Sequence, residues 1–166
     1  FNEAEHSNTW PNVEKHTYMD VTRNGKNSGF LSLLYPSKNR DYPETNKIEN
    51  VLEIKKDDWR GLAFVNENNE LIEVGGIKTD ASRFFVKYKD NKIEYLFADD
   101  VSKIYLNDEE LISSDARTTI AIKFNGENLE VNYKDNGNII LNKKPTEVLY
   151  NNEISNNLIS DNGVIL

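Results

Sequence analysis

Alternation of apolar and polar residues with a period of two is the feature that most restricts the fold of this chain. Ile120, Ile122 and Phe124 alternate with polar residues and would share one face of a strand, and segment 128–133 repeats the pattern. Asn-Gly at 125–126 lies between the two segments and tolerates the positive φ angles of a tight hairpin turn. The two segments therefore predict a β-hairpin with one buried face.

The same alternation, interrupted by Asn, Asp and Gly turns, continues along most of the chain. It predicts strands over 17–22, 29–35, 51–55, 59–65, 70–75, 83–88, 92–97, 101–106, 110–112, 119–124, 128–133, 139–141 and 147–150. No window of ten or more residues has the apolar spacing of a helix. We therefore predict an all-β fold, an antiparallel two-sheet β-sandwich with hairpin connections and little helix.

Polar segments divide the chain into three predicted parts. Residues 1–16 are polar and interrupted by Pro11, which predicts an irregular N-terminal segment. Residues 17–153 form the predicted β-sandwich domain, with a long polar loop over 36–47 that contains two prolines. Residues 154–166 are rich in Asn and are predicted to form a C-terminal tail.

Charge and residue usage exclude several classes of function. The 166 residues carry a net charge of -8 and no basic stripe, so we expect no nucleic-acid partner. The chain has no cysteine, which excludes disulfides, thiolate zinc sites and cysteine nucleophiles. No stretch approaches the roughly 20 apolar residues that a membrane-spanning helix needs, so we expect no membrane partner.

The sequence has no motif that predicts a cofactor or an active site. The acidic groups at 57–58, 99–100 and 108–110 supply hard oxygens, but none has the spacing of a calcium-binding loop. We interpret these acidic groups as residues of solvated turns. Binding of a structural calcium ion is the alternative interpretation. The nucleophile, phosphate-loop and zinc-binding motifs are all missing. We therefore predict neither a cofactor nor a metal site.

Four residues are candidates for carbohydrate binding: Trp10, Tyr42, Trp59 and Arg60. An exposed aromatic ring can stack on a sugar, and an arginine can pair with a carboxylate or sulfate group. Trp10 and Tyr42 lie outside clear strand patterns, which favours exposure. For Trp59 the alternative is a core aromatic, with Arg60 pointing outward by alternation.

His16 and Tyr18 are weak candidates for catalysis, since histidine titrates near neutral pH. With Arg23 and Lys26 they come nearest in this sequence to the cluster that a lyase would need. The other histidine, His6, lies ten residues away, and this spacing matches no standard metal site. No catalytic residue is assigned.

Two segments resemble a known family. Segment 29–36, Gly-Phe-Leu-Ser-Leu-Leu-Tyr-Pro, is a strand that runs into a proline and a polar loop. Segment 138–151 has a Lys-Pro that leads into a Val-Leu strand and an Asn turn. Both are similar to parts of the C-terminal β-sandwich domain of heparinase II/III-like polysaccharide lyases, and the strand rhythm between them is compatible.

The resemblance implies a secreted or periplasmic bacterial enzyme that cleaves an acidic polysaccharide by β-elimination. In that family a helical toroid precedes the β-domain and supplies most catalytic residues, so this chain would brace the catalytic domain and contact the acidic glycan. No catalytic motif of the family matches a position in this sequence. The missing initiator Met at Phe1 also leads us to expect a mature product or part of a longer protein.

Three alternatives stay open. The chain could be a stand-alone carbohydrate-binding module, which would need a row of exposed aromatic residues. It could be a structural or adhesion domain with a polar surface, or a complete small lyase. A large exposed apolar face would instead favour an accessory domain that has lost its partner.

Overall fold

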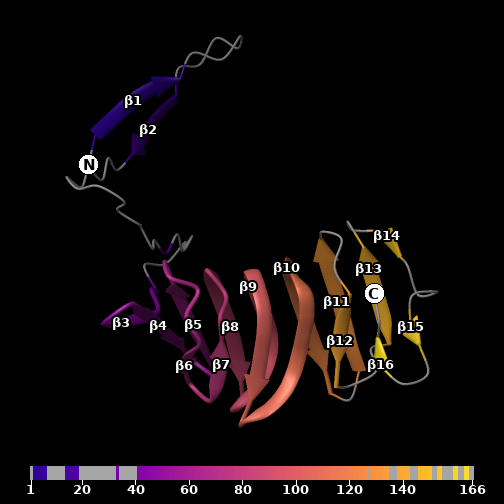
Figure 1. Ribbon diagram of the computed structural model, residues 1–166. Coiled ribbons are helices and arrows are strands. Elements are labelled where there is room, and N and C mark those ends of the chain that lie inside the picture. Colours follow the sequence, from indigo (N-terminus) through magenta and orange to yellow (C-terminus); the bar gives the residue numbers. More distant parts are fainter. Residues whose placement is uncertain are drawn as a thin grey trace. The chain divides into compact units, whose positions relative to one another are not determined.

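The computed structural model describes residues 2–6, 14–18, 33, 41–126, 128–134, 138–142, 146–150, 153–154, 159–160 and 163–164. The chain forms two compact units, 1–30 and 31–166. Every regular element among the described residues is a β-strand (Figure 1). The prediction of an all-β chain is therefore confirmed for these residues, and none of them belongs to a helix that could cross a membrane.

The first unit contains an antiparallel hairpin of β1 (Asn2–His6) and β2 (Glu14–Tyr18). The prediction of an irregular segment over 1–16 is wrong at these strands, and the predicted strand at 17–22 overlaps only the end of β2. Pairing of backbone groups needs no apolar side chains, so polar strands such as these lack the alternation that reveals a half-buried strand.

The second unit contains a 12-stranded sheet and a separate short pair, β15 (Ile159–Ser160) with β16 (Gly163–Val164). The strands of the large sheet are β3 (Glu44–Ile48), β4 (Val51–Lys56), β5 (Trp59–Val65), β6 (Ile72–Val74), β7 (Ile77–Thr79), β8 (Arg83–Lys89), β9 (Lys92–Leu106), β10 (Glu109–Asn125), β11 (Asn128–Lys134), β12 (Ile139–Leu141), β13 (Glu147–Tyr150) and β14 (Glu153–Ile154).

The sheet follows the order β14-β13-β11-β10-β9-β8-β5-β4-β3, and β6, β7 and β12 lie off this path. All pairs are antiparallel except β11 with β13, which are parallel. The sheet is therefore mixed, and the prediction of purely antiparallel strands is wrong at this pair. The cause is β12, which pairs with β10 beyond the end of β11. The chain then returns to the other end of β11 before it forms β13, so β13 runs parallel to β11.

β9 and β10 are long strands that pair with different neighbours along their lengths. The first part of β9 pairs with β8, and its last residues pair with β7. Likewise β10 pairs with β12 near its start and with β11 near its end. Register shifts interrupt the β9–β10 pairing between Ser113 and Ile120, opposite the positive φ of 51° at Asp100. Sequence analysis placed breaks here and so predicted two strands in place of each long one.

One hydrophobic core joins both parts of these long strands. Leu96 and Ile122 come from the parts that pair with β8 and β11, and Ile104 and Ile112 come from the parts that pair with β7 and β12. All four side chains are fully buried. The strands nevertheless form one hydrogen-bonded sheet, so the finer prediction of two separate sheets is not confirmed.

Hydrogen bonds from Arg117 stabilise the irregular part of the β9–β10 pair. Its Nε donates to Asp100 Oδ1 at 2.7 Å and its Nη1 to Asp80 Oδ2 at 3.1 Å. Its Nη2 donates to the carbonyl oxygens of both aspartates. Asp80 also accepts hydrogen bonds from the backbone of Ser102 and Lys103, each at 2.9 Å. This group of residues holds the backbone where the strands lose their register.

Other predictions of strands and loops also need correction. The loop predicted over 36–47 ends in β3, whose residues 44–48 are all exposed and so give no apolar signal. β7 was missed because it has only three residues, and the prediction of a tail over 154–166 is wrong at β15 and β16, which have two residues each. Of the predicted strand at 29–35 the structure describes only Leu33, which is not in a strand.

Candidate functional site

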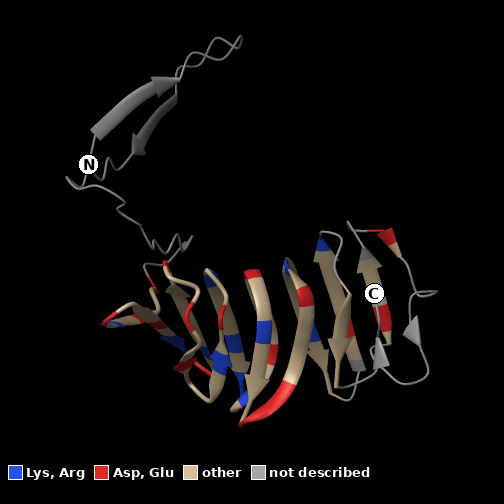
Figure 2. Cartoon of the chain, viewed as in Figure 1, with Lys and Arg blue, Asp and Glu red and all other residues tan. Residues whose placement is uncertain are grey.

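A row of lysines and one tryptophan crosses four neighbouring strands. Lys56 of β4 lies opposite Trp59 of β5, Trp59 lies opposite Lys89 of β8, and Lys89 lies opposite Lys92 of β9. Residues that are directly opposed in antiparallel strands project from the same face of the sheet. We call these four residues the Trp59 row, and blue segments lie on neighbouring strands at this side of the sheet (Figure 2).

A fourth lysine lies over the ring of the tryptophan. The Nζ of Lys87 lies 5.9 Å from the centre of the Trp59 ring, within the range of a cation–π contact. Lys87 is two residues from Lys89, so both lysines project from the same face of β8. The Trp59 ring therefore carries a positive charge above it and lysines on both neighbouring strands.

Most of these lysines have acidic partners at the surface. Lys87 Nζ lies 2.6 Å from Glu94 Oε2, and Lys89 Nζ lies 3.6 Å from Asp58 Oδ2. Lys56, the most covered of the row, pairs with Asp41. Lys92 is exposed and has no ion pair within the described part of the chain. Because exposed ion pairs such as those of Lys87 and Lys89 contribute only about 0–1 kcal/mol, an anionic ligand could replace their carboxylates at little cost.

Glu94 shows the electrostatic effect of the lysines. The hydrogen bond from Lys87 is the main reason that the pKa of Glu94 is lowered from its ordinary value, and the charges of Lys87 and Lys89 act in the same direction. Glu94 also lies where the β8–β9 pairing shifts register, because Lys87 faces Tyr95 whereas Tyr88 faces Ile93. The bulge brings its carboxylate to Lys87.

Aromatic rings continue from Trp59 along the same face. Phe85 and Tyr95 lie with ring centres 6.3 Å apart, and Phe97 is directly opposite Phe85. A Cβ atom at Gly61 would come within 3.2 Å of the Phe85 ring and 3.4 Å of the Trp59 ring, so the glycine leaves room for both. Burial raises the pKa of Tyr95.

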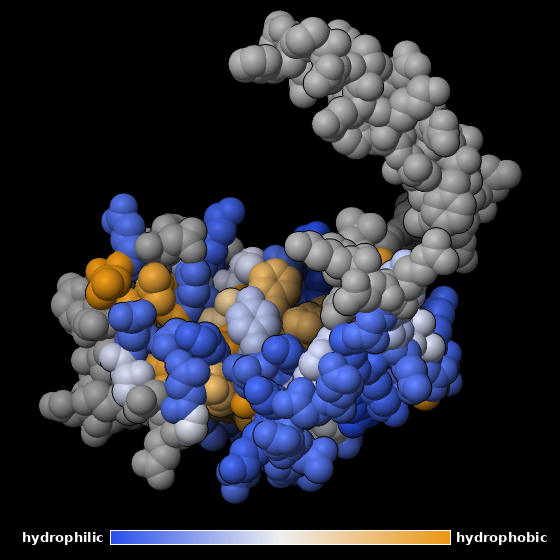
Figure 3. Space-filling view, turned by 180° about the vertical axis from the view of Figure 1, so that it is seen from behind, coloured by the Kyte–Doolittle hydropathy of each residue, from blue (hydrophilic) through white to orange (hydrophobic). Residues whose placement is uncertain are grey.

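These four rings are half-buried and none belongs to the core. Figure 3 shows a face of the molecule on which apolar residues gather in the middle and hydrophilic residues surround them. The arrangement offers flat apolar surface beside amines that can donate hydrogen bonds or bind anions. These are the two elements of recognition that an acidic sugar chain needs.

Trp59 and Arg60 lie on opposite faces of β5, as alternation requires. Trp59 is half-buried, so the alternative of a core aromatic is wrong. Arg60 Nε donates to Glu53 Oε1 at 2.6 Å, and its guanidinium lies 5.9 Å from the Tyr88 ring. The hydrogen bond from Lys55, together with the one from Arg60, lowers the pKa of Glu53. The two predicted residues therefore do not form one site.

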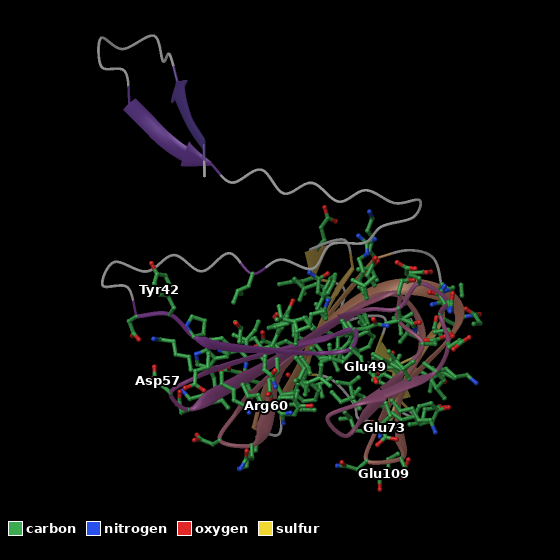
Figure 4. All side chains as sticks on the ribbon, turned by 90° about the vertical axis from the view of Figure 1, so that its left-hand side faces the viewer. Tyr42, Glu49, Asp57, Arg60, Glu73 and Glu109 are labelled. Carbon is green, nitrogen blue, oxygen red and sulfur yellow. The ribbon has the colours of Figure 1, made fainter. Side chains whose placement is uncertain are left out.

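Tyr42 lies at the same end of the sheet as the Trp59 row. Its side chain is 62% exposed, and its neighbour Asp41 pairs with Lys56. Figure 4 shows Tyr42 and Asp57 on one side, at the end of β4 that is opposite to Glu49 in the β3–β4 turn. The structure thus brings Tyr42 and Trp59 to one region, although they are 17 positions apart in the sequence.

The remaining candidates lie in the first unit. Trp10 falls outside the described residues. His16 and Tyr18 both lie in β2, opposite Ala4 and Asn2. Arg23 and Lys26, which completed the predicted lyase cluster, also fall outside the described residues.

Sequence analysis found no basic stripe in the chain, and it singled out neither the lysines beside Trp59 nor Tyr95. The signal that was present is the spacing of Lys87, Lys89 and Lys92 around the Asp90-Asn91 turn. Both turn residues have positive φ angles, 49° and 60°, which is typical of a tight two-residue hairpin. Such a turn places Lys89 and Lys92 opposite each other.

The acidic groups do not assemble a metal site in the described part of the chain, where no three metal-ligating side chains come together. Comparison with protein-family models gives no match, and a search of curated proteins gives no significant match.

Proposed function

We propose that this chain is an accessory β-domain of a secreted or periplasmic bacterial polysaccharide lyase, and that it contacts an acidic glycan through the Trp59 row. The observation that carries the proposal is the register of β4, β5, β8 and β9, which aligns three lysines with one half-buried tryptophan. The likeness of segments 29–36 and 138–151 to the heparinase II/III-like β-domain supports the choice of parent enzyme.

The chemistry of the row favours an acidic polysaccharide over a neutral one. A sugar ring can stack on Trp59, while its carboxylate or sulfate groups reach Lys89 and Lys92. The chain as a whole carries a net charge of -8, so long-range attraction to a polyanion is unfavourable. Binding must therefore depend on this local group of lysines, which makes the proposal sensitive to their replacement.

The fold can serve an accessory role in this proposal. The parts of β9 and β10 that pair with β7 and β12 would pack over the rest of the sheet as the second layer of a sandwich, since both parts contribute to one core. A catalytic domain of the same parent protein would supply the reacting groups, and this chain would line one side of the substrate cleft.

A second candidate function is a structural domain that uses the aromatic face to pack against another domain. Phe85 and Phe97 favour it, because they are half-buried and lie beside each other on β8 and β9, away from the row of lysines. In that case the rings contribute to a domain interface and the lysines only solvate its rim.

Replacement of Trp59 by alanine is expected to weaken binding to a polyuronate about tenfold, because a lost ring contact of about 1.4 kcal/mol changes Kd by that factor. Isothermal titration calorimetry on the purified chain measures this. Tyr105→Ala is the matched control, since Tyr105 is a half-buried aromatic in the part of β9 that pairs with β7. Unchanged affinity of Trp59→Ala would overturn the role of the row.

The lysines are tested in the same way. The pair Lys89→Gln and Lys92→Gln is expected to weaken polyuronate binding, whereas Lys103→Gln with Lys134→Gln removes the same charge from exposed positions elsewhere and should change little. Absorbance of an unsaturated uronate product is followed in the same samples. A rise in this absorbance would make the chain itself a lyase and would contradict its accessory role.

A further inference from the structure

A groove of about 640 Å³ opens beside the β8–β9 turn, next to the Trp59 row. Four hairpin turns surround it, those between β6 and β7, β8 and β9, β9 and β10, and β10 and β11. Lys89 and Lys92 belong both to the row and to the lining of the groove. Tyr88 and Ile93 of the groove lie on the opposite face of the sheet from the row, so the two features meet around this hairpin tip. Small-molecule sites commonly have volumes of about 300–1,000 Å³.

The β6–β7 turn closes one side of the groove. Tyr88 Oη donates a hydrogen bond to the carbonyl oxygen of Gly75 at 3.0 Å. The backbone N–H of Asn107 donates to the carbonyl oxygen of Gly76, also at 3.0 Å. The turn is thus tied to β8 on one side and to the β9–β10 turn on the other. A polymer that passed from the Trp59 row around the β8–β9 turn would meet this turn.

The lining combines apolar side chains with hydrogen-bonding groups. Tyr88, Ile93, Leu106 and Phe124 line the groove and pack against the hydrophobic core while staying partly exposed. Two of these residues have aromatic rings, which suit the apolar C–H face of a sugar. The amine of Lys92 at the rim has no ion pair in the described part of the chain and is available to a carboxylate.

We infer that the groove binds the terminal residue of an acidic oligosaccharide, with the Trp59 row holding the residues that follow. This inference rests on the proposed function and refines it, because it predicts recognition of a chain end as well as of the chain. A single uronate sugar should then bind to the groove alone. The contribution of one residue is small, so binding is expected in the millimolar range, about -4 kcal/mol.

The test is a titration of the complete chain with glucuronate, followed by the amide signals of Gly75, Gly76 and Gly126 in nitrogen-15 correlated NMR spectra. All three glycines line the groove. We expect glucuronate to shift these signals and glucose to leave them in place. Equal shifts with glucose, or saturation by glucuronate without any shift of the three glycines, would overturn the inference.

Two variants connect the shifts to the groove. Leu106→Trp fills the groove and should abolish the glucuronate shifts, whereas Leu71→Trp makes the same exchange at a residue that is 45% exposed and outside the groove. Phe124→Ala removes a ring and should weaken glucuronate binding at least threefold, and it keeps the test decisive if Leu106→Trp does not fold. Undiminished glucuronate binding in a folded variant of either kind would contradict the inference.

Failure of the inference and failure of the proposed function have different signatures. Trp59→Ala should leave the glucuronate shifts intact while it weakens polyuronate binding. If polyuronate binds through the row but glucuronate does not reach the groove, only the inference fails. If Trp59→Ala leaves polyuronate affinity unchanged, the proposed function fails whatever the monosaccharide does.

Discussion

Replacing Arg117 with alanine is expected to lower the free energy of unfolding by about 3 kcal/mol, because it leaves Asp80 without its cationic partner. The Asp80 side chain is only 13% exposed, whereas that of Arg117 is 34% exposed. The substitution also removes the donors that reach the carbonyl oxygens of Asp80 and Asp100. Urea unfolding followed by circular dichroism measures the change.

Arg83→Ala is the matched control for Arg117→Ala. Arg83 Nη2 pairs with Asp99 Oδ2 at 2.5 Å, but the arginine side chain is 70% exposed. An exposed pair contributes at most about 1 kcal/mol, so this variant should remain close to the native stability. Equal losses in the two variants would contradict the role given to Arg117.

The same residues predict how stability depends on pH. Burial raises the pKa of Asp80, but the hydrogen bonds of Ser102 and Lys103 and the charge of Arg117 outweigh it and hold that pKa below its ordinary value. Hydrogen bonds from Ser82 and Arg117 lower the pKa of Asp100. Their stabilisation is complete above the unfolded value of about 3.9 and is lost as the pH falls through the folded values. The loss on acidification should be smaller in Arg117→Ala.

Replacing Gly75 with alanine is expected to destabilise the chain by about 3 kcal/mol. The backbone of Gly75 has a φ of 62°, a conformation that costs other residues about 1 kcal/mol. In addition, the new Cβ atom would overlap Cδ1 of Leu62, which is 2% exposed and lies in the core. Overpacking of a core costs about 1–3 kcal/mol. Thermal and urea unfolding would both show the loss.

Gly126→Ala separates the two contributions. Gly126 has nearly the same φ, 64°, but apart from its chain neighbours no atom of the described residues lies within 4 Å of a Cβ atom at this position. This variant should therefore lose only the backbone contribution of about 1 kcal/mol. If the two alanine variants were equally stable, the packing of the β6–β7 turn on Leu62 would be wrong.

The fold class follows from the sequence wherever one face of a strand is buried. In β10 and β11, Ile120, Ile122, Leu129 and Val131 are all fully buried, which confirms the alternation used to predict the hairpin. Where a strand buries no side chain the signal disappears, as in β3. The sequence also does not show that β9 and β10 are each one continuous strand, because the polar residues at their bulges are of the kinds that form turns.

Less of the candidate site than of the fold could be predicted from the sequence. Alternation alone separates Trp59 from Arg60, and the sequence analysis stated this as the alternative, although Trp59 proved to lie outside the core. The neighbours of Trp59 depend on the register of three strand pairs. A shift of one residue in any of them would send the lysines to the other face. Register is decided by turn geometry and core packing together, so no local pattern reveals the row.

The central claim is that the Trp59 row binds an acidic glycan, and the most direct measurement is the affinity of the unmodified chain for a polyuronate and for a neutral polysaccharide at low and high salt. We expect binding to the polyuronate only, with an affinity that falls as salt rises, because the contacts of exposed lysines are screened. Equal affinity for the neutral polysaccharide, or no binding to either at low salt, would contradict the account.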